Sequence, residues 1–394
     1  MRALCVAVVV VSWLAVAVAE KVKPFIYDEV YKDPCDDPSK EPPRKRNFCN
    51  GNAILMWASK GKHRKVKELL KQPDTAYLIT YQEARGWRKG YTALLWASEA
   101  NSTRTVLMLL DAGSIIDHKS YGNFTAVYLL AENSNLAGVT RIMEMGADPN
   151  VVTAMGYTAL FMATWNGHPQ IVKVLLDHNA NPNFTTPTTN YFPLYIASKN
   201  GYTEIVEHLL DAYANFNLRT SWGVTALHAA TYWGHLDIVI ALLAAGADTD
   251  IQEKDGYTPL HKATYYEFPD IVMALLDSGA DVDLQSKEGD TALIYAAKKG
   301  NVDLITLLVN ATANPNLQEH TGKTAMHWAV INRKANCVRA LLWSCPDLNV
   351  RDHDGMTAYD IAKYKPKNEV LQLLEGHDPS NCTMNPDFMG NDVY

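Results

Sequence analysis

The chain has 394 residues, of which 47% are hydrophobic and 20% are charged, and its formal net charge is −7 at pH 7. A chain of this length ordinarily forms two or three globular domains. The mildly acidic balance argues against a general nucleic-acid-binding protein, which needs a basic face, although it leaves room for one local basic patch.

The first predicted element is a secretory signal peptide at residues 1–19. Arg2 is followed by an apolar run that ends in the small residues Ala17-Val18-Ala19, as expected of a cleavage site. The alternative is a membrane anchor, but the run is short for a bilayer span of about 20 residues. No other segment of the sequence approaches a membrane span. We therefore expect cleavage after Ala19 and a secreted mature protein without a membrane span.

Asn-x-Ser/Thr sequons fit the same compartment. They begin at Asn101, Asn123, Asn183, Asn310 and Asn381. Each is a glycosylation acceptor only where it is exposed in the lumen of the secretory pathway. We expect some of these asparagines, not all, to carry a glycan.

Residues 20–50 form a leader that is rich in Pro, Lys and Asp. Its cysteines, Cys35 and Cys49, are expected to pair in an oxidising compartment. Such a bridge closes a loop of about 15 residues, a stabilisation of roughly 3 kcal/mol on the chain-entropy model, and could cap the apolar end of the first structural unit. We interpret Arg44-Lys45-Arg46 as a solvated charge cluster, with a protease processing site as the alternative.

From residue 51 onward the chain repeats one unit with a period of 33 residues. The segment Gly223–Asp255 begins again at Gly256, and equivalent threonines follow the same spacing at Thr225, Thr258, Thr291, Thr324 and Thr357. In this unit the apolar spacing predicts a helix of about two turns near Leu227 and a second, more apolar helix from Leu236. Gly246 tolerates the positive φ of a helix end. Neither helix can bury its apolar face alone, so the units must stack.

The unit resembles the ankyrin repeat. The matching residues are Thr225-Ala226-Leu227-His228-Ala229-Ala230, Gly234-His235 and Ala244-Ala245-Gly246-Ala247-Asp248, followed in the next unit by Thr258-Pro259-Leu260-His261 and Gly279-Ala280-Asp281-Val282-Asp283. The resemblance implies an all-α solenoid of about ten helix-turn-helix repeats with short β-hairpin-like fingers. We assign residues 51–375 to this array and residues 376–394 to a polar C-terminal tail.

The repeats are not uniform. The first two open at Gly51 and Gly90, so six extra residues lie in the finger between them. The fifth repeat is offset by one residue, with a longer turn over residues 185–189. The tenth has Asp360 where other repeats have His, and Pro366 interrupts it. We interpret this last unit as a C-terminal cap.

The remaining cysteines lie near the end of the array. Cys345 follows the second helix of the ninth repeat, and Cys382 lies in the tail. Cys337 is in register with Leu304 and is expected to point into the core. Register therefore favours a Cys345–Cys382 bridge with Cys337 as a buried free thiol, although sequence does not fix connectivity.

We predict no enzyme, no metal site and no cofactor. The GxSxG, HExxH and P-loop motifs are absent. His228, His261 and His327 share one repeat position, where the resemblance implies a backbone hydrogen bond between repeats. Cys337 and Cys345 lack the spacing of zinc ligands. Turn geometry, rather than calcium, accounts for the acidic residues Asp248, Asp250, Asp281 and Asp283.

In proteins of this family the recognition surface is usually the concave face, built from finger tips and the first helix of each repeat. The positions that map there are unusually aromatic, and we predict that the partner contacts Trp165, Trp222, Tyr232, Trp233, Tyr257, Tyr265, Tyr266 and Lys298. Tyr and Trp anchor protein interfaces, and the alternative is that these rings only stack between repeats. Because Lys298 and Lys299 continue the row, a partner with an acidic, partly apolar face would suit it.

The function favoured by the sequence is non-catalytic binding of a protein ligand by a secreted scaffold. Aromatic rows also bind sugars, so a carbohydrate-binding or extracellular-matrix module is one alternative. A secreted toxin-like or effector-like protein is another, since spider latrotoxins are similar in carrying ankyrin arrays. Neither the identity of the ligand nor the oligomeric state follows from the sequence.

Overall fold

The computed structural model describes residues 43–84, 86, 88–364 and 369–376. The predicted signal peptide, Cys35, Pro366, Asn381 and Cys382 lie outside these residues. The chain divides into two compact units, one up to Gly122 and one from Asn123 onward, and each is described by itself.

The first unit contains five helices among its described residues: α2 (Pro43–Ser59), α3 (His63–Leu69), α4 (Thr75–Thr80), α5 (Ala93–Glu99) and α6 (Thr103–Asp111). Helix α2 begins at Pro43, so it joins the end of the predicted leader to the first repeat, and Arg44-Lys45-Arg46 lie in its first turn. The predicted insertion between the first two repeats contains the short helix α4, which buries Leu78 and Ile79.

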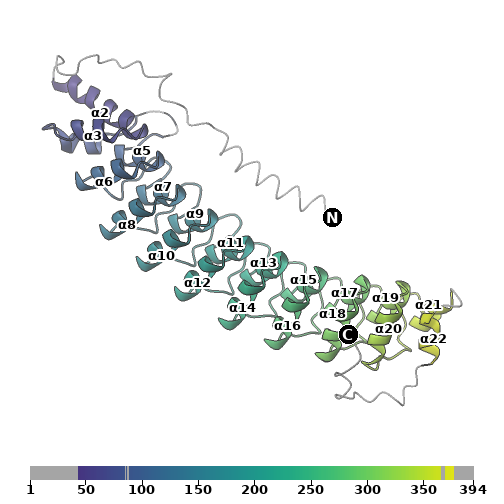
Figure 1. The fold of residues 1–394 in the computed structure, drawn as a ribbon. Coiled ribbons are helices and arrows are strands. Elements are labelled where there is room, and N and C mark those ends of the chain that lie inside the picture. The colour runs from purple at the N-terminus through teal and green to yellow at the C-terminus, as the bar shows by residue number, and fades with distance from the viewer. Residues whose placement is uncertain (1–42, 85, 87, 365–368, 377–394) are drawn as a thin grey trace. The chain divides into compact units, whose positions relative to one another are not determined.

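The second unit contains pairs of short antiparallel helices (Figure 1). The first helices of the pairs are α7 (Ala126–Glu132), α9 (Ala159–Trp165), α11 (Pro193–Asn200), α13 (Ala226–Trp233), α15 (Pro259–Tyr265), α17 (Ala292–Lys299), α19 (Ala325–Ile331) and α21 (Ala358–Lys363). The second helices are α8 (Leu136–Glu144), α10 (Pro169–Asp177), α12 (Thr203–Asp211), α14 (Leu236–Ala244), α16 (Pro269–Asp277), α18 (Val302–Asn310), α20 (Ala335–Leu342) and α22 (Glu369–Glu375).

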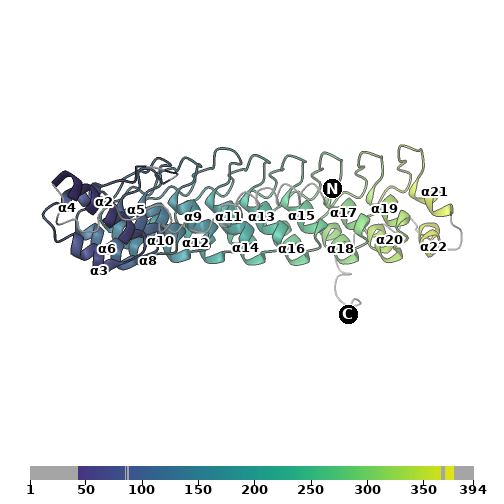
Figure 2. The ribbon, with the colours of Figure 1, turned by 90° about the horizontal axis from the view of Figure 1, so that it is seen from above.

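The two kinds of helix form two rows. Figure 1 shows the first helices on the inner side of this unit's gentle curve and the second helices on its outer side. Figure 2 shows the turns that precede the first helices projecting together to one side. The described residues form no strand, and one isolated antiparallel bridge joins Arg351 and Thr357. The predicted all-α class with stacked helix-turn-helix repeats is therefore confirmed.

A threonine starts most of the first helices. In α13 the extended residue Thr225 is the N-cap, and its hydroxyl accepts a hydrogen bond from the backbone N–H of His228 at 3.3 Å. This bond satisfies one of the amide groups that a helix start leaves without a partner. Gly234 ends the helix with φ at 74°, a left-handed conformation that favours glycine. Gly246, predicted as a helix stop, follows the end of α14 with φ at 89°, so that prediction is confirmed.

The second helices supply large aliphatic side chains to the core, beside the buried residues of the first helices. In α14 the side chains of Ile238, Val239 and Leu242 are completely buried. Each such aliphatic side chain contributes about 1.5–3 kcal/mol through removal from water. Cys337 in α20 is also completely buried and carries a free thiol, as register predicted, and burial raises the pKa of that thiol.

The fingers are turns closed by a single hairpin-type hydrogen bond. In the finger before α15, the N–H of Glu253 donates to the carbonyl of Tyr257 at 2.9 Å. Neighbouring fingers are joined by a further backbone bond, such as that from Lys254 N–H to the Trp222 carbonyl at 2.9 Å. In the fifth repeat the closing bond runs from Thr186 to Tyr191, which confirms the predicted longer turn.

Candidate protein-binding surface

Five aromatic side chains, at the ends of α13 and α15 and in the middle of α17, form a continuous series of ring contacts. We call them the aromatic row: Tyr232, Trp233, Tyr265, Tyr266 and Tyr295. The ring centroids of Tyr232 and Trp233 are 5.2 Å apart, and those of Tyr232 and Tyr266 are 4.7 Å apart. Tyr265 continues the series, 5.0 Å from Tyr266 and 5.7 Å from Tyr295. The aromatic row therefore spans three successive repeats, on the side of the unit formed by the first helices.

The aromatic row remains accessible although its members touch one another. Tyr232 is 41% exposed, Trp233 53%, Tyr265 44% and Tyr266 37%. The interplanar angles in the row lie between 66° and 87°, so the rings meet edge to face. Edge-to-face pairs are the favourable geometry for aromatic side chains. The contacts pre-arrange the rings and leave large apolar area that a partner can cover.

Tyr295 was not among the residues predicted from the sequence, and it connects other predicted residues to the row. Its hydroxyl donates to the hydroxyl of Tyr257 at 3.1 Å. The Lys298 ammonium lies 5.6 Å from the Tyr295 ring centroid and 4.8 Å from that of Trp328. Tyr295 lies one helical turn before Lys298 and Lys299, so the i, i+3 and i+4 spacing was the available signal.

Two predicted residues lie in other aromatic groups. Trp222 is 42% exposed in a finger, where its ring centroid lies 6.1 Å from that of Tyr191. Trp165 is half-buried at the end of α9, 5.9 Å from the ring of Phe161. The structure brings Tyr232, Trp233, Tyr265 and Tyr266 together and does not join Trp222 or Trp165 to them.

The repeated histidines have no free nitrogen for chemistry. Nδ1 of His228 accepts from the Thr225 backbone N–H at 3.3 Å, and its Nε2–H donates to the Tyr257 carbonyl of the next repeat at 3.0 Å. Because an amide N–H can only donate and a carbonyl can only accept, both partners require the neutral ring with its proton on Nε2. His261 reaches the Asp290 carbonyl at 2.9 Å in the same way. The predicted structural role, a backbone hydrogen bond between repeats, is confirmed.

Burial reinforces this protonation state. His228 and His261 are almost completely buried, and burial lowers the pKa of each to about 4. The pKa of His327 is lowered for the same reason. These rings stay neutral at physiological pH because their environment disfavours the charged form.

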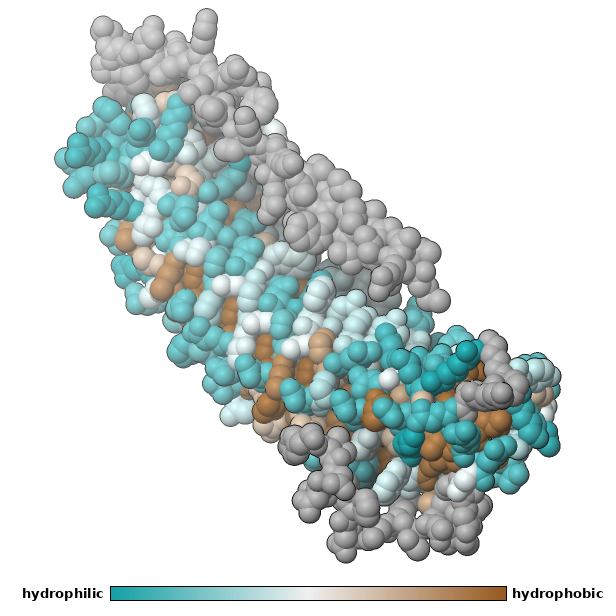
Figure 3. Space-filling view, turned by 45° about the vertical axis from the view of Figure 1, so that its right-hand side comes forward, coloured by the Kyte–Doolittle hydropathy of each residue, from teal (hydrophilic) through white to brown (hydrophobic). Residues whose placement is uncertain are grey.

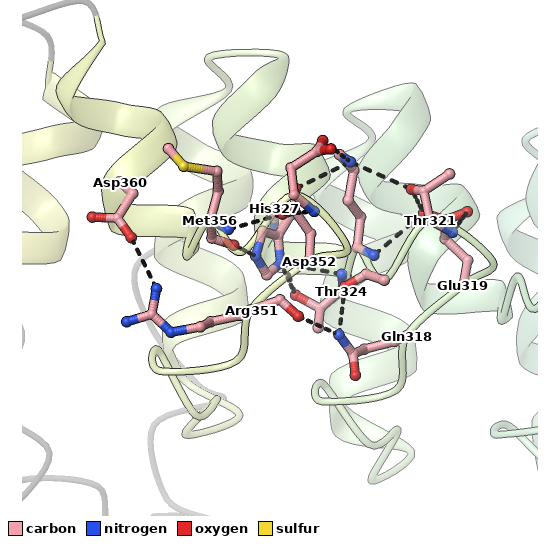
Figure 4. Close-up of polar contacts among 12 residues, drawn as sticks. Gln318, Glu319, Thr321, Thr324, His327, Arg351, Asp352, Met356 and Asp360 are labelled. Atoms are coloured by element: carbon pink, nitrogen blue, oxygen red, sulfur yellow. Dashed lines mark hydrogen bonds and ion pairs between the residues drawn. The ribbon is translucent and has the colours of Figure 1, made fainter.

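Figure 4 shows how the last two repeats are joined. His327 donates to the Met356 carbonyl at 3.2 Å, and Lys323 pairs with the buried carboxylate of Asp352 at 3.1 Å. Burial of Asp352 raises its pKa, but hydrogen bonds from Met356 N–H and Lys323 outweigh it and hold the pKa below its usual range. At the histidine position of the last repeat, Asp360 accepts from the Thr357 N–H at 3.1 Å. The aspartate thus preserves the hydrogen bond that caps the helix, but its side chain is too short to bond to the backbone of a further repeat as the histidines do.

A ladder of side-chain hydrogen bonds that joins successive fingers was also not predicted from the sequence. Nε2 of Gln252 donates to the Gly256 carbonyl of its own finger and to the Gln285 carbonyl of the next, both at 2.8 Å. Gln285 and Gln318 repeat the arrangement, and Arg219 contacts the carbonyls of Gly223 and Gln252. The spacing of 33 residues was the signal that could have revealed this ladder.

The acidic turn residues serve the backbone. The carboxylate of Asp248 accepts from the Asp250 N–H at 2.9 Å, and that of Asp250 accepts from the Asp281 N–H of the next repeat, also at 2.9 Å. Asp281 and Asp283 continue the pattern. Turn geometry thus accounts for these residues. Within residues 43–376, as far as they are described, no cluster of three or more His, Cys, Asp or Glu could hold a metal ion.

The predicted glycosylation sites within the described chain are accessible. Asn101, Asn123, Asn183 and Asn310 are all exposed. In the second unit, Asn310 ends α18 in the row of second helices, and none of these asparagines belongs to α13, α15 or α17. Glycans at these positions would therefore start outside the helices that carry the aromatic row. Cys49 is buried in α2, and its proposed partner Cys35 lies outside the described residues.

The visible surface in Figure 3 shows hydrophobic residues in separate patches among hydrophilic ones. None of the helices in the described part of the chain is both long and apolar enough to cross a membrane.

Comparison with known proteins identifies the repeat. A family model described as ankyrin repeats (3 copies) matches residues 115–186, 178–255, 194–285, 240–319 and 311–385. Ankyrin repeat protein FPV031 of Fowlpox virus (strain NVSL) is 38% identical over 135 residues, which cover 34% of this chain and 38% of the viral protein. Ankyrin repeat protein FPV034 of the same virus is 33% identical over 92 residues, which cover 23% of this chain and 21% of that protein.

The chain thus spans well under half the length of these two relatives. The family model, in contrast, matches most of this chain, and the described helix pairs and fingers fit it. The chain belongs to the ankyrin repeat family, whose members are generally non-catalytic protein-interaction scaffolds.

Proposed function

We propose that this protein binds a protein partner through the aromatic row on α13, α15 and α17. The observation that carries the proposal is the accessibility of four touching rings, of which Trp233 is the most exposed at 53%. Rigid aromatic side chains lose little conformational entropy on binding, and they are enriched among interface residues that contribute most to affinity. A protein surface that covers the aromatic row would bury this apolar area, and the row's side chains would lose little conformational freedom because they already contact one another.

The protein partner is favoured over a glycan by the ring geometry. A sugar stacks on an open, flat ring face, whereas neighbouring rings in the row meet at 66° or more. Such a corrugated apolar surface suits interdigitating side chains.

Affinity capture tests this proposal. The bait is the full chain, beside a variant with Tyr232, Trp233, Tyr265 and Tyr266 changed to Ala and a control with Tyr213→Ala. Tyr213 follows α12 and is 90% exposed, so the control removes an accessible tyrosine outside the row. We expect a discrete protein to be retained by wild type and control and lost by the row variant, with helical circular dichroism unchanged. Equal retention by all three would refute the proposal.

We further propose that the protein acts outside the cell, after removal of residues 1–19. The apolar run and the exposed sequons support this proposal, which also predicts the cystines Cys35–Cys49 and Cys345–Cys382. Protein expressed in a eukaryotic secretory host should appear in the medium with Glu20 as its first residue. Its mass should fall on treatment with an asparagine-glycan hydrolase, and non-reduced peptide maps should contain both cystines. Retention in cells with Met1 intact would contradict secretion.

A further inference from the structure

In the middle of the second unit the two rows of helices differ in charge. The first helices α9, α11, α13, α15, α17 and α19 contain no Asp or Glu, and their charged residues are Lys199, Lys262, Lys298 and Lys299. Each of the second helices α12, α14, α16 and α18 has at least one Asp or Glu and no Lys or Arg. In these repeats the inner row is therefore neutral to basic and the outer row is acidic, whereas outside them α7 and α21 carry Glu132 and Asp360, and α20 carries Arg339.

The lysines of the inner row differ in how far their charge is already compensated. Lys262 pairs with Glu253, and Lys298 pairs with the buried carboxylate of Asp290. Lys299 has no ion pair among the described residues, and its ammonium lies 4.2 Å from the ring centroid of Tyr265. Lys299 thus places an uncompensated positive charge directly against the aromatic row.

Two more basic residues lie beside Lys299. Asn332 donates to the Lys298 carbonyl at 3.0 Å, which holds the end of α19 against the end of α17. Arg333 and Lys334 follow it and are exposed. The side chain of Lys334 lies over Gly300, where an added Cβ would be 2.8 Å from its Cε atom. We call Lys299, Arg333 and Lys334 the basic end of the aromatic row.

The basic end is too local for a nucleic acid strand. Proteins that bind single strands combine stacking rings with a continuous positive groove that follows the phosphates. In the neighbouring fingers Lys254 is followed by Asp255 and Lys287 by Glu288, so their charges alternate. A polypeptide carries charge only where its sequence has charged residues. It can therefore place apolar side chains on the aromatic row and acidic side chains on the basic end.

We infer that the partner presents an acidic polypeptide segment, with apolar side chains against Tyr232, Trp233 and Tyr266 and carboxylates against Lys299, Arg333 and Lys334. This inference rests on the proposed function. It adds the chemistry of the bound segment and the order in which its apolar and acidic side chains lie along the aromatic row and its basic end. Carboxylates at the basic end gain charge-assisted contacts, and the acidic outer row repels the same segment from the opposite face. Electrostatic complementarity of this kind determines which partner is accepted and how it is aligned.

Selection of random 12-residue peptides displayed on phage tests the inference without knowledge of the natural partner. The full chain is the target, beside Lys299→Glu/Lys334→Glu and a control, Lys173→Glu, which reverses the charge of one lysine on the outer helix α10. We expect peptides selected by wild type to be enriched in Asp and Glu next to aromatic or aliphatic residues. Their Kd should rise roughly tenfold or more for the double variant and less than twofold for the control.

The outcomes separate this inference from the proposed function. Peptides that require Tyr232 and Tyr266 but show no acidic preference would overturn the inference and leave the proposed function standing. If no selected peptide depends on the aromatic row, both fail. Tighter binding of a single-stranded oligonucleotide than of any peptide would identify a nucleic acid instead. Concentration-dependent sedimentation of wild type, lost in the double variant, would identify the acidic outer row of a second copy as the occupant and likewise overturn the inference.

Discussion

Lowering the pH from 7 toward 4.5 is expected to destabilise the array by several kcal/mol. His228 and His261 have a pKa of about 4 in the folded protein, against about 6.5 in an unfolded chain. Between these values the unfolded state binds more protons, so the free energy of unfolding falls as pH falls. The stabilisation is complete above about pH 6.5 and is lost progressively toward pH 4. Each histidine accounts for a loss on the order of 3 kcal/mol.

The structural reason is that protonation would place two hydrogen-bond donors, a ring N–H and a backbone N–H, against each other. A proton on Nδ1 of His228 would face the Thr225 backbone N–H, which now donates to that nitrogen at 3.3 Å. Urea denaturation followed by circular dichroism at several pH values between 7.5 and 4.5 measures the effect. A His228→Gln/His261→Gln variant, which cannot titrate, should be less stable at pH 7.5 but show a flatter dependence on pH. A wild-type protein equally stable at pH 7 and pH 4.5 would contradict this assignment.

Gly256→Ala is expected to cost about 3 kcal/mol or more of stability. Gly256 has φ at 82°, and a Cβ added there would lie 2.6 Å from the backbone nitrogen of Lys287 in the next finger. That finger is held in place by the bond from Lys287 N–H to the Asp255 carbonyl at 3.0 Å. The left-handed conformation alone costs an alanine about 1–2 kcal/mol. The methyl group must in addition separate two fingers and disturb the bond from Gln252 to the Gly256 carbonyl.

Gly279→Ala is the matched control for this effect. Gly279 has φ at 87°, but no atom lies within 4 Å of its added Cβ. It should therefore lose only the roughly 1–2 kcal/mol of the left-handed conformation. Thermal or urea unfolding of both variants separates backbone strain from the contact between fingers. Equal destabilisation of the two variants would show that finger packing does not contribute.

The repeat period made most of the fold predictable. Thr225, Gly234 and Gly246 mark helix boundaries by well-understood local chemistry, and their recurrence every 33 residues makes each assignment reinforce the next. Helix α4 was missed because the insertion that contains it has no counterpart in other repeats, so only weak local propensity was available. The start of α2 at Pro43 was missed for the same reason.

The candidate surface was predictable only in part. Register placed Tyr232, Trp233, Tyr265 and Tyr266 correctly on neighbouring repeats, because stacked units keep equivalent positions aligned. Register did not reveal which rings touch: Tyr266 lies 4.7 Å from Tyr232, whereas Trp222 joins Tyr191 instead. Such contacts depend on how the fingers and helix ends are offset in space, which a linear pattern does not specify.

Site-specific photo-crosslinking tests the central claim most directly. A photoreactive phenylalanine analogue would replace Tyr266 in one sample and Tyr213 in another, and each would be irradiated with the captured partner. Both side chains are accessible, at 37% and 90% exposure, but only Tyr266 belongs to the aromatic row. We predict a covalent adduct from position 266 and none from position 213. An adduct from position 213 alone would show that the partner binds elsewhere and would contradict recognition through the aromatic row.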